Sequence, residues 1–252
     1  MSDGKPSDLV RSVVRAAQIL EELGSRRDGL TAKRIATRCR LNLATTYHLL
    51  RTLRYEQYVV QGPGHRYFLG PRVASQFRDL KAALEQPPHV GEVLRHISET
   101  TGQSAYYGQF IGEHLLVSDV VEGPYSPHLE QLMVHFDEAP HATAIGKALL
   151  WALPSTTRRE YLKQRGLRPF TSNTVVHLDT LDHELKSLAH RHVFVEHEQY
   201  RSNVCCAAVL VRHHDHIIGA IGIPAPAERW RRSNTDLIRA LRTAVADLRQ
   251  PV

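Results

Sequence analysis

The stretch that most constrains the fold runs from Thr31 to Leu53, TAKRIATRCRLNLATTYHLLRTL. Read at a helical period, it predicts a short helix, a break at Arg40–Leu41 and a second helix that Asn42 caps. The apolar face of the first helix consists of Ile35, Ala36 and Cys39. In the second helix the inward positions are Thr46, Leu49, Leu50 and Leu53, and the outward ones are Ala44, Thr45, Tyr47, His48 and Arg51.

Two short helices joined by a tight turn are typical of a DNA-reading helix-turn-helix, and an ordinary helical hairpin is the alternative. Small side chains at the start of the second helix allow it to enter a major groove, where Tyr47 and Arg51 reach base edges or phosphates. The candidate DNA contacts come from both helices and from the hairpin that follows them. They are Thr31, Arg34, Asn42, Ala44, Thr45, Thr46, Tyr47, His48, Arg51, His65 and Arg66.

The flanking sequence predicts that this pair of helices belongs to a winged helix-turn-helix. Upstream, residues 10–23 carry apolar side chains at helical spacing, which predicts an amphipathic helix that Gly24 ends. Its inward positions are Val10, Val13, Val14, Ala17, Leu20 and Leu23. Downstream, residues 58–61 and 66–69 are typical of two strands around the tip Gly62-Pro63-Gly64-His65. This hairpin is the predicted wing, close to the sugar-phosphate backbone or the minor groove.

Charge is distributed unevenly along the chain. Residues 1–86 carry 15 Lys and Arg against 8 Asp and Glu, whereas residues 87–252 carry 17 against 18. The positive net charge of the chain therefore comes from the segment with the helix-turn-helix. A basic surface neutralises DNA phosphates and gives an affinity that falls with salt, although a basic face is often only solvated.

The rest of the chain predicts a linker helix and an α+β domain. Residues 72–86 have apolar side chains along one face, which packs on its own domain or on the same helix of a second copy; they are Val73, Phe77, Leu80 and Leu84. From residue 89, helices mixed with hairpins favour a largely antiparallel sheet with helices against it. The predicted strands are 104–111, 114–121, 129–134, 193–196, 204–212 and 217–223, and the predicted helices are 89–101, 141–153, 157–164, 181–190 and one near 237–248.

We therefore expect a winged helix-turn-helix domain at 1–70, a linker at 71–88 and a second domain at 89–252. No apolar run approaches the length of a membrane span, and MSDGKPSDLV has no signal-peptide core. Cys205 and Cys206 are adjacent, a spacing that strains a disulfide and favours a reducing compartment. These features predict a cytoplasmic protein that does not bind a membrane.

Several segments resemble the IclR-type family of bacterial transcriptional regulators. They are RAAQILEEL, GLTAKRIATRCRLNLATTYHLLRTLRYEQYVV and HRYFLGPRV, followed by HATAIGKALLWALP, LDTLDHELKSL and VCCAAVLVRHHDHIIGAIGI. The resemblance covers nearly the whole chain, in the family's order. It implies a homodimer or a dimer of dimers that binds a palindromic operator in double-stranded DNA. It also implies a GAF-like domain in which a small-molecule effector modulates that binding.

The same resemblance implies an effector pocket. The turn Ala144-Ile145-Gly146 begins a helix whose free amides can bind an anion, although small residues also serve close packing. His141 and Lys147 flank this turn and either contact an anionic ligand or cap and solvate the helix. Glu196 stands at the family's acidic position, and Cys206 matches a strand cysteine that lies in the pocket or only in the core. The candidate effector contacts are Tyr106, Leu132, Met133, Ala144, Ile145, Gly146, Glu196, Cys206, Gly222 and Pro224.

Three positions depart from the family pattern. Gly222 and Pro224 stand where members that bind small oxo-acids tend to have serines, and Ile145 replaces a smaller residue. The loss of two hydroxyl donors weakens a site for a carboxylate. We therefore expect an effector larger or more apolar than glyoxylate or pyruvate, such as an aromatic compound. Either Tyr106 or Tyr107 faces it, because adjacent strand residues point to opposite sides of a sheet.

The sequence also suggests functions of other classes. His213, His214 and His216 could hold a metal, but a hairpin tip points ligands to opposite sides, so we expect a solvated turn and no cofactor. An enzyme could use Cys206 as a nucleophile with a histidine and Glu196, yet no GxSxG, HExxH, phosphate-binding or dinucleotide-binding motif is present. A winged helix that binds protein is the remaining alternative, and the basic N-terminal segment argues against it.

Overall fold

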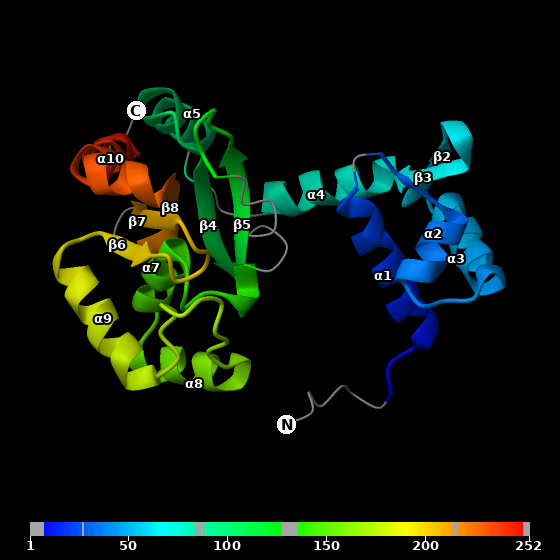
Figure 1. Ribbon diagram of the computed structural model, residues 1–252, viewed down its shortest axis with the longest axis horizontal. Coiled ribbons are helices and arrows are strands. Elements are labelled where there is room, and N and C mark those ends of the chain that lie inside the picture. Colours follow the sequence, from blue (N-terminus) through cyan, green and yellow to red (C-terminus); the bar gives the residue numbers. More distant parts are fainter. Residues whose placement is uncertain are drawn as a thin grey trace. The chain divides into compact units, whose positions relative to one another are not determined.

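The structure is a computed structural model that describes residues 8–26, 28–83, 87, 89–127, 136–213 and 216–248. It contains two compact units, Met1–Leu84 and Glu85–Val252 (Figure 1). One hydrophobic core lies in the first unit, and two cores lie in the second.

The first unit has the winged helix-turn-helix that the sequence predicts. Ile19, Ile35 and Leu50 are fully buried where its first three helices meet. Burial of each such side chain stabilises the unit by about 1.5–3 kcal/mol. The elements are α1 (Arg11–Gly24), β1 (Leu30–Thr31), α2 (Ala32–Arg38), α3 (Leu43–Tyr55), β2 (Val59–Gly62), the 3-10 turn η1 (Pro63–His65), β3 (Arg66–Leu69) and α4 (Pro71–Ala83).

Side-chain caps begin both helices of the helix-turn-helix. Thr31 Oγ1 accepts a hydrogen bond from the Arg34 amide at 3.4 Å, and Asn42 Oδ1 accepts one from the Thr45 amide at 2.7 Å. Between the helices, Arg40 has a φ of 53°, in the left-handed region that reverses the chain. The caps and this reversal fix the direction in which α3 leaves the turn.

The wing contains a third strand that was not predicted from the sequence. Strand β3 pairs with β2 on one side and with β1 on the other, in the order β1-β3-β2. In the second pairing Leu30 lies opposite Tyr67, and Thr31 lies opposite Arg66. A strand of two residues is too short to show a period in the sequence. Its pairing attaches the wing directly to the start of α2.

The inward face of α1 differs from the prediction. Ile19 and Leu23 are buried, but Val10 and Val13 expose 63% and 65% of their surface, and Ala17 is also exposed. The core made by α2 and α3 covers only the side of α1 that carries Ile19 and Leu23, so the valines near its N-terminus remain outside that core. Apolar spacing alone could not show where this small core ends.

Helix α4 also exposes apolar side chains. It has no buried residue, and Phe77 and Leu80 expose 51% and 41% of their surface. Of the two alternatives for this apolar face, packing on its own domain leaves about half of the surface of these two side chains exposed. Leu84, which belongs to the same predicted face, lies outside the described residues.

The second unit has the α+β fold that the sequence predicts. Its elements follow the predicted order, and the predicted strand at 129–134 lies outside the described residues. Gly102 ends the first helix in the left-handed conformation. The elements are α5 (Val90–Thr101), β4 (Ala105–Ile111), β5 (His114–Val121), η2 (Phe136–Glu138), α7 (Ala144–Ala152), α8 (Ser155–Arg165), α9 (Leu178–His190), β6 (Phe194–His197), β7 (Val204–His213), β8 (His216–Pro226) and α10 (Ala227–Asp247).

Within the part of the second unit that the structure describes, the sheet has five antiparallel strands in the order β5-β4-β8-β7-β6. Helices α5 and α10 cover one face, and α7 and α9 cover the other (Figure 1). Tyr107 points into the α5–α10 core, where its hydroxyl donates to Ile218 O at 2.8 Å. Tyr106 points into the α7 core. Of the two tyrosines, only Tyr106 therefore faces the region of the predicted effector pocket.

Candidate DNA-binding surface and effector pocket

The exposed face of α3 carries small, aromatic and basic side chains. Ala44, His48 and Arg51 are exposed, and Tyr47 exposes 48% of its surface. The capping residue Asn42 is exposed at the start of the same helix. Small groups followed by hydrogen-bonding and cationic ones are the combination that a helix in a major groove requires.

Thr46 does not belong to this face. Its side chain is fully buried, and its hydroxyl donates to Asn42 O at 3.0 Å. The prediction of Thr46 as a DNA contact is therefore wrong, and its inward position in the helical pattern already indicated burial. Thr45 is half-buried, and its amide is held by the Asn42 side chain.

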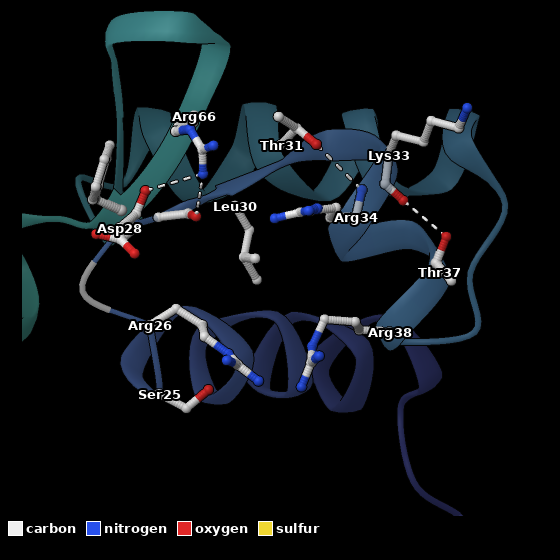
Figure 2. A pocket seen from close by; sticks show the side chains of 12 residues that line it. Ser25, Arg26, Asp28, Leu30, Thr31, Lys33, Arg34, Thr37, Arg38 and Arg66 are labelled. Carbon is white, nitrogen blue, oxygen red and sulfur yellow. Dashed lines mark hydrogen bonds between the residues drawn. The ribbon is translucent and has the colours of Figure 1, made fainter.

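A groove of about 1420 Å³ lies between the end of α1, the start of α2 and the wing (Figure 2). Among the described residues, five cationic residues and one acidic residue, Asp28, line it. Figure 2 shows Arg34 extending into the groove from α2 and Arg66 from β3. Such a concentration of positive charge attracts phosphates. The lining residues are Ser25, Arg26, Asp28, Gly29, Leu30, Thr31, Lys33, Arg34, Thr37, Arg38, Arg66 and Phe68.

Only part of this groove was predicted from the sequence. The predicted contacts include Thr31, Arg34 and Arg66 but not the cations Arg26, Lys33 and Arg38. These residues come from three segments that meet through the pairing of β1 with β3. Because that strand pair was not predicted, the sequence offered no reason to group them.

The side chains of the two candidate wing residues, Arg66 and His65, differ in burial and in how firmly hydrogen bonds hold them. Arg66 is half-buried, and its Nη1 donates to the carbonyl oxygens of Asp28 at 3.3 Å and Gly29 at 3.1 Å. The guanidinium is thus held against the segment that precedes α2. His65 is exposed at the tip, and its Nδ1 lies 3.4 Å from Gln61 Nε2.

In the second unit, a small cavity lies where the start of α7 meets the sheet. Its volume is about 20 Å³, enough for about one water molecule. Six of its lining residues were predicted from the sequence, namely Tyr106, Ala144, Ile145, Cys206, Gly222 and Pro224. The others are Thr143, Tyr200, Ala207 and Ile223. Among the described lining residues, hydroxyl groups come only from the two tyrosines and the threonine, so most of this described wall is apolar.

Of the lining residues that were not predicted, Thr143 had a recognisable signal. It is the N-cap of α7, and its Oγ1 accepts from the Gly146 amide at 3.2 Å. A threonine before a small-residue turn is a common helix start. Tyr200 comes from the loop between β6 and β7 and reaches the cavity only through the tertiary fold, so local sequence could not indicate it.

Two predicted effector contacts lie outside the cavity lining, and two cannot be placed. Gly146 packs closely, because a Cβ there would lie 2.3 Å from Pro140 O. Glu196 is fully buried opposite Cys206 in the pairing of β6 with β7. Gly146 and Glu196 therefore do not line this cavity, and their contact with an effector stays a prediction. Leu132 and Met133 lie outside the described residues.

Lys147 belongs to a buried polar network under α7. Its side chain is fully buried, and its Nζ donates to Glu184 Oε1 at 2.8 Å and to Gln199 Oε1 at 2.7 Å. Burial lowers the pKa of Lys147, and the Glu184 carboxylate opposes this effect. His141 is also buried, and its Nε2 lies 2.9 Å from Arg168 O. Neither side chain lines the cavity, so both support the packing around it.

The protonation of Cys206 disfavours the enzyme alternative. Burial raises the pKa of the Cys206 thiol well above its ordinary value, and the nearby Glu196 carboxyl raises it further. Burial also raises the pKa of Glu196 to about 7. A nucleophilic cysteine needs a stabilised thiolate, usually beside a cation or a helix N-terminus. The surroundings of Cys206 favour the neutral thiol instead.

The histidine-rich hairpin tip was the sequence feature nearest to a metal site. His213 and His216 pair across β7 and β8, whereas His214 lies outside the described residues. Within the described ranges, no group of three or more His, Cys, Asp or Glu side chains is placed to hold a metal ion. In the same ranges, no helix is both long and apolar enough to cross a membrane.

A winged helix-turn-helix with a basic groove, followed by an α+β unit with a small apolar cavity, defines the class of ligand-responsive DNA-binding regulators. Family models support this class. The model described as bacterial transcriptional regulator IclR C-terminal matches residues 89–250, and the IclR helix-turn-helix domain matches residues 12–63. The chain therefore belongs to the IclR family of bacterial transcriptional regulators, which bind DNA and carry a C-terminal effector-binding domain.

Individual relatives agree with this assignment. The chain is 29% identical over 238 residues to the HTH-type transcriptional regulator Rv1719 of Mycobacterium tuberculosis, covering 92% of this chain and 88% of that protein. The crystal structure of the Thermotoga maritima IclR has a TM-score of 0.74 at 19% identity, with 94% and 97% covered. An IclR homolog from Microbacterium hydrocarbonoxydans, crystallised with 4-hydroxybenzoate, has a TM-score of 0.71 at 16% identity, with 94% and 97% covered.

Proposed function

We propose that α3 reads the operator and that the groove of Figure 2, together with the wing, binds the DNA backbone. The observation that carries this proposal is the exposed row of Tyr47, His48 and Arg51 on a helix that Asn42 caps. The groove cations lie in the same unit and supply charge for phosphates. Because each chain has one such helix, a palindromic operator takes two copies, and we propose a homodimer or a dimer of dimers.

Substitution of Arg51 tests the reading helix. We expect Arg51→Ala to weaken operator binding by about 1–3 kcal/mol and to relax specificity at one base position. Gel shifts of the full chain on the intergenic DNA beside its own gene, at two salt concentrations, measure this effect. Arg95→Ala, which removes an exposed cation from α5, is the matched control and should bind like the wild type. If the Arg51→Ala variant gives the same gel shift as the wild type, DNA reading must be assigned to another element.

For the second unit, we propose that the cavity at α7 is the closed form of the effector pocket. The amides of Ala144 and Ile145 begin α7 and have no hydrogen-bond acceptor among the described residues, so they can receive a carboxylate. The apolar lining favours an effector with an apolar body. The 4-hydroxybenzoate in the Microbacterium homolog is a compound of this kind. An effector larger than pyruvate requires the pocket to open.

The effector class is tested on the same operator DNA. We expect an aromatic monocarboxylate such as benzoate to change the gel shift at lower concentration than glyoxylate or pyruvate. Neutral benzyl alcohol is the matched control for the carboxylate. Saturation of the protein by micromolar glyoxylate would contradict the proposed preference.

A further inference from the structure

Ile145 occupies the volume beside the cavity. It is the second residue of α7, and it exposes only 5% of its surface. Its side chain lies against two strands that pair with each other, at Gly108 in β4 and Gly222 in β8. A Cβ on Gly108 would lie 2.7 Å from Ile145 Cγ2, and a Cβ on Gly222 would lie 2.6 Å from Ile145 Cγ1. Neither position can carry a Cβ while the Ile145 side chain remains where it is.

Space is a reason for glycine at both positions. Neither Gly108 nor Gly222 has a positive φ, so a left-handed backbone is not what requires glycine there, although Gly108 also lies at a register shift in the pairing of β4 with β5. A glycine inside a strand weakens the strand and often marks a close approach of another group. Here that group is the Ile145 side chain. Gly108 and Gly222 thus form a seat for this side chain on the sheet.

The cavity of about 20 Å³ is the space that remains next to this seat. We propose that Ile145 closes the effector pocket and sets the size of the ligand that it accepts. This inference rests on the proposed effector pocket. An aromatic monocarboxylate binds when its ring replaces the Ile145 side chain on Gly108 and Gly222, and its carboxylate meets the first amides of α7. Because the Ile145 side chain must leave first, only the open fraction of the wild-type protein can bind. The apparent association constant is therefore the intrinsic constant multiplied by that open fraction.

Truncation of Ile145 tests this inference in the full chain. We expect Ile145→Ala to bind benzoate at least about tenfold more tightly than the wild type, measured by titration calorimetry. Affinity for glyoxylate should not increase, because glyoxylate has no ring to fill the space. Ile145→Val, which removes a single methyl group, should give a smaller gain and serves if the alanine variant does not fold.

Two matched variants test whether the gain in benzoate affinity depends on the space beside Gly108 and Gly222. Ile145→Ala/Gly222→Ala returns a Cβ to the seat and should lose most of the gain. Ile221→Ala truncates the neighbouring residue of β8, which is fully buried in the core on the opposite face, and should bind benzoate like the wild type. An equal gain in the Ile221 variant would mean that general loosening, and not the seat, governs affinity, and it would overturn the inference.

Benzene separates the failure of this inference from the failure of the proposed effector class, because it fills an apolar cavity without a carboxylate. We expect Ile145→Ala to bind benzene more tightly than both the wild type and the Ile145→Ala/Gly222→Ala variant. If this holds while benzoate binds neither protein, Ile145 sets the pocket size and the carboxylate assignment is wrong. If a cooperatively folded Ile145→Ala protein binds benzene no better than the wild type, the role of Ile145 is overturned.

Discussion

Lys147 and Glu196 are fully buried ionisable residues near the cavity, and they are stabilised differently. Lys147 has two acceptors, Glu184 and Gln199, at ion-pair and hydrogen-bond distance. Glu196 accepts the Gln199 amide at 2.8 Å, but for this carboxyl the cost of desolvation is the largest effect. Its pKa is therefore raised from an ordinary 4.5 to about 7.

This raised pKa predicts that Glu196 makes the protein less stable as pH rises. The folded state keeps its proton up to about pH 7, whereas the unfolded state releases it near 4.5, so stability falls between these values and levels off above them. We expect Glu196→Gln to gain stability over the wild type by about 3 kcal/mol between pH 4 and pH 8, as measured by urea unfolding. Glu99→Gln, on the exposed side of α5, should follow the wild-type profile. Parallel profiles for all three proteins would contradict the raised pKa of Glu196.

Single residues also show which features could be predicted from the sequence and which could not. The helical period assigned Thr46 to the inside of α3, and the structure buries it. The resemblance to the IclR-type family, and not the helical period, suggested Ile145 as an effector contact, and in the structure Ile145 lines the cavity that we propose as the effector pocket. That its side chain closes the pocket depends on Gly108, which is distant in sequence and adjacent only after β4 packs beneath α7.

At the scale of elements, the sequence predicted the helices that local caps and apolar spacing determine, and it missed the strand that depends on pairing with a distant segment. Helices α2 and α3 follow their caps and apolar spacing, because a cap acts within one turn. Strand β1 could not be predicted, because its two residues are ordered by pairing with β3. For the same reason the cationic groove, which depends on that pairing, was only partly predicted.

The Asn42 cap supports a prediction for α3. Asn42→Ala removes the acceptor of the Thr45 amide and should lower the stability of the first unit by about 1 kcal/mol. Thermal unfolding measures this change, and operator binding should weaken as the first turn of α3 frays. Asn42→Ser restores a capping oxygen and should recover most of the stability. Equal stability of the alanine and serine variants would show that the cap does not contribute.

At the scale of the whole molecule, exposed apolar side chains of the first unit bear on the proposed assembly of two copies. The first unit exposes large apolar side chains at Val10, which precedes α1, at Val13 in α1, and at Phe77 and Leu80 in α4. Exposed apolar patches commonly mark an interface. A second copy of the chain would cover them and would supply the second reading helix that a palindrome needs.

The exposed face of α4 predicts the effect of polar substitutions on assembly. Phe77→Ser/Leu80→Ser should shift the dimer toward monomer by more than tenfold, because burial of each side chain contributes about 1.5–3 kcal/mol. Sedimentation measures this shift, and operator affinity should fall with it. Arg78→Ser, an exposed position on the same helix, should leave assembly unchanged. A stable dimer of the double variant would locate the interface elsewhere.

The contact between Ile145 and Gly222 also has a consequence for evolution. While isoleucine stands at position 145, even an alanine at position 222 would meet its Cγ1 at 2.6 Å, so that step is closed. Once Ile145 has become smaller, a Cβ at position 222 no longer meets Cγ1, and its remaining close neighbour is Ala207 O at 3.2 Å, so a small side chain such as serine needs only a slight shift of that strand. For this pair of positions, a lineage that starts from this chain is therefore expected to change position 145 before position 222.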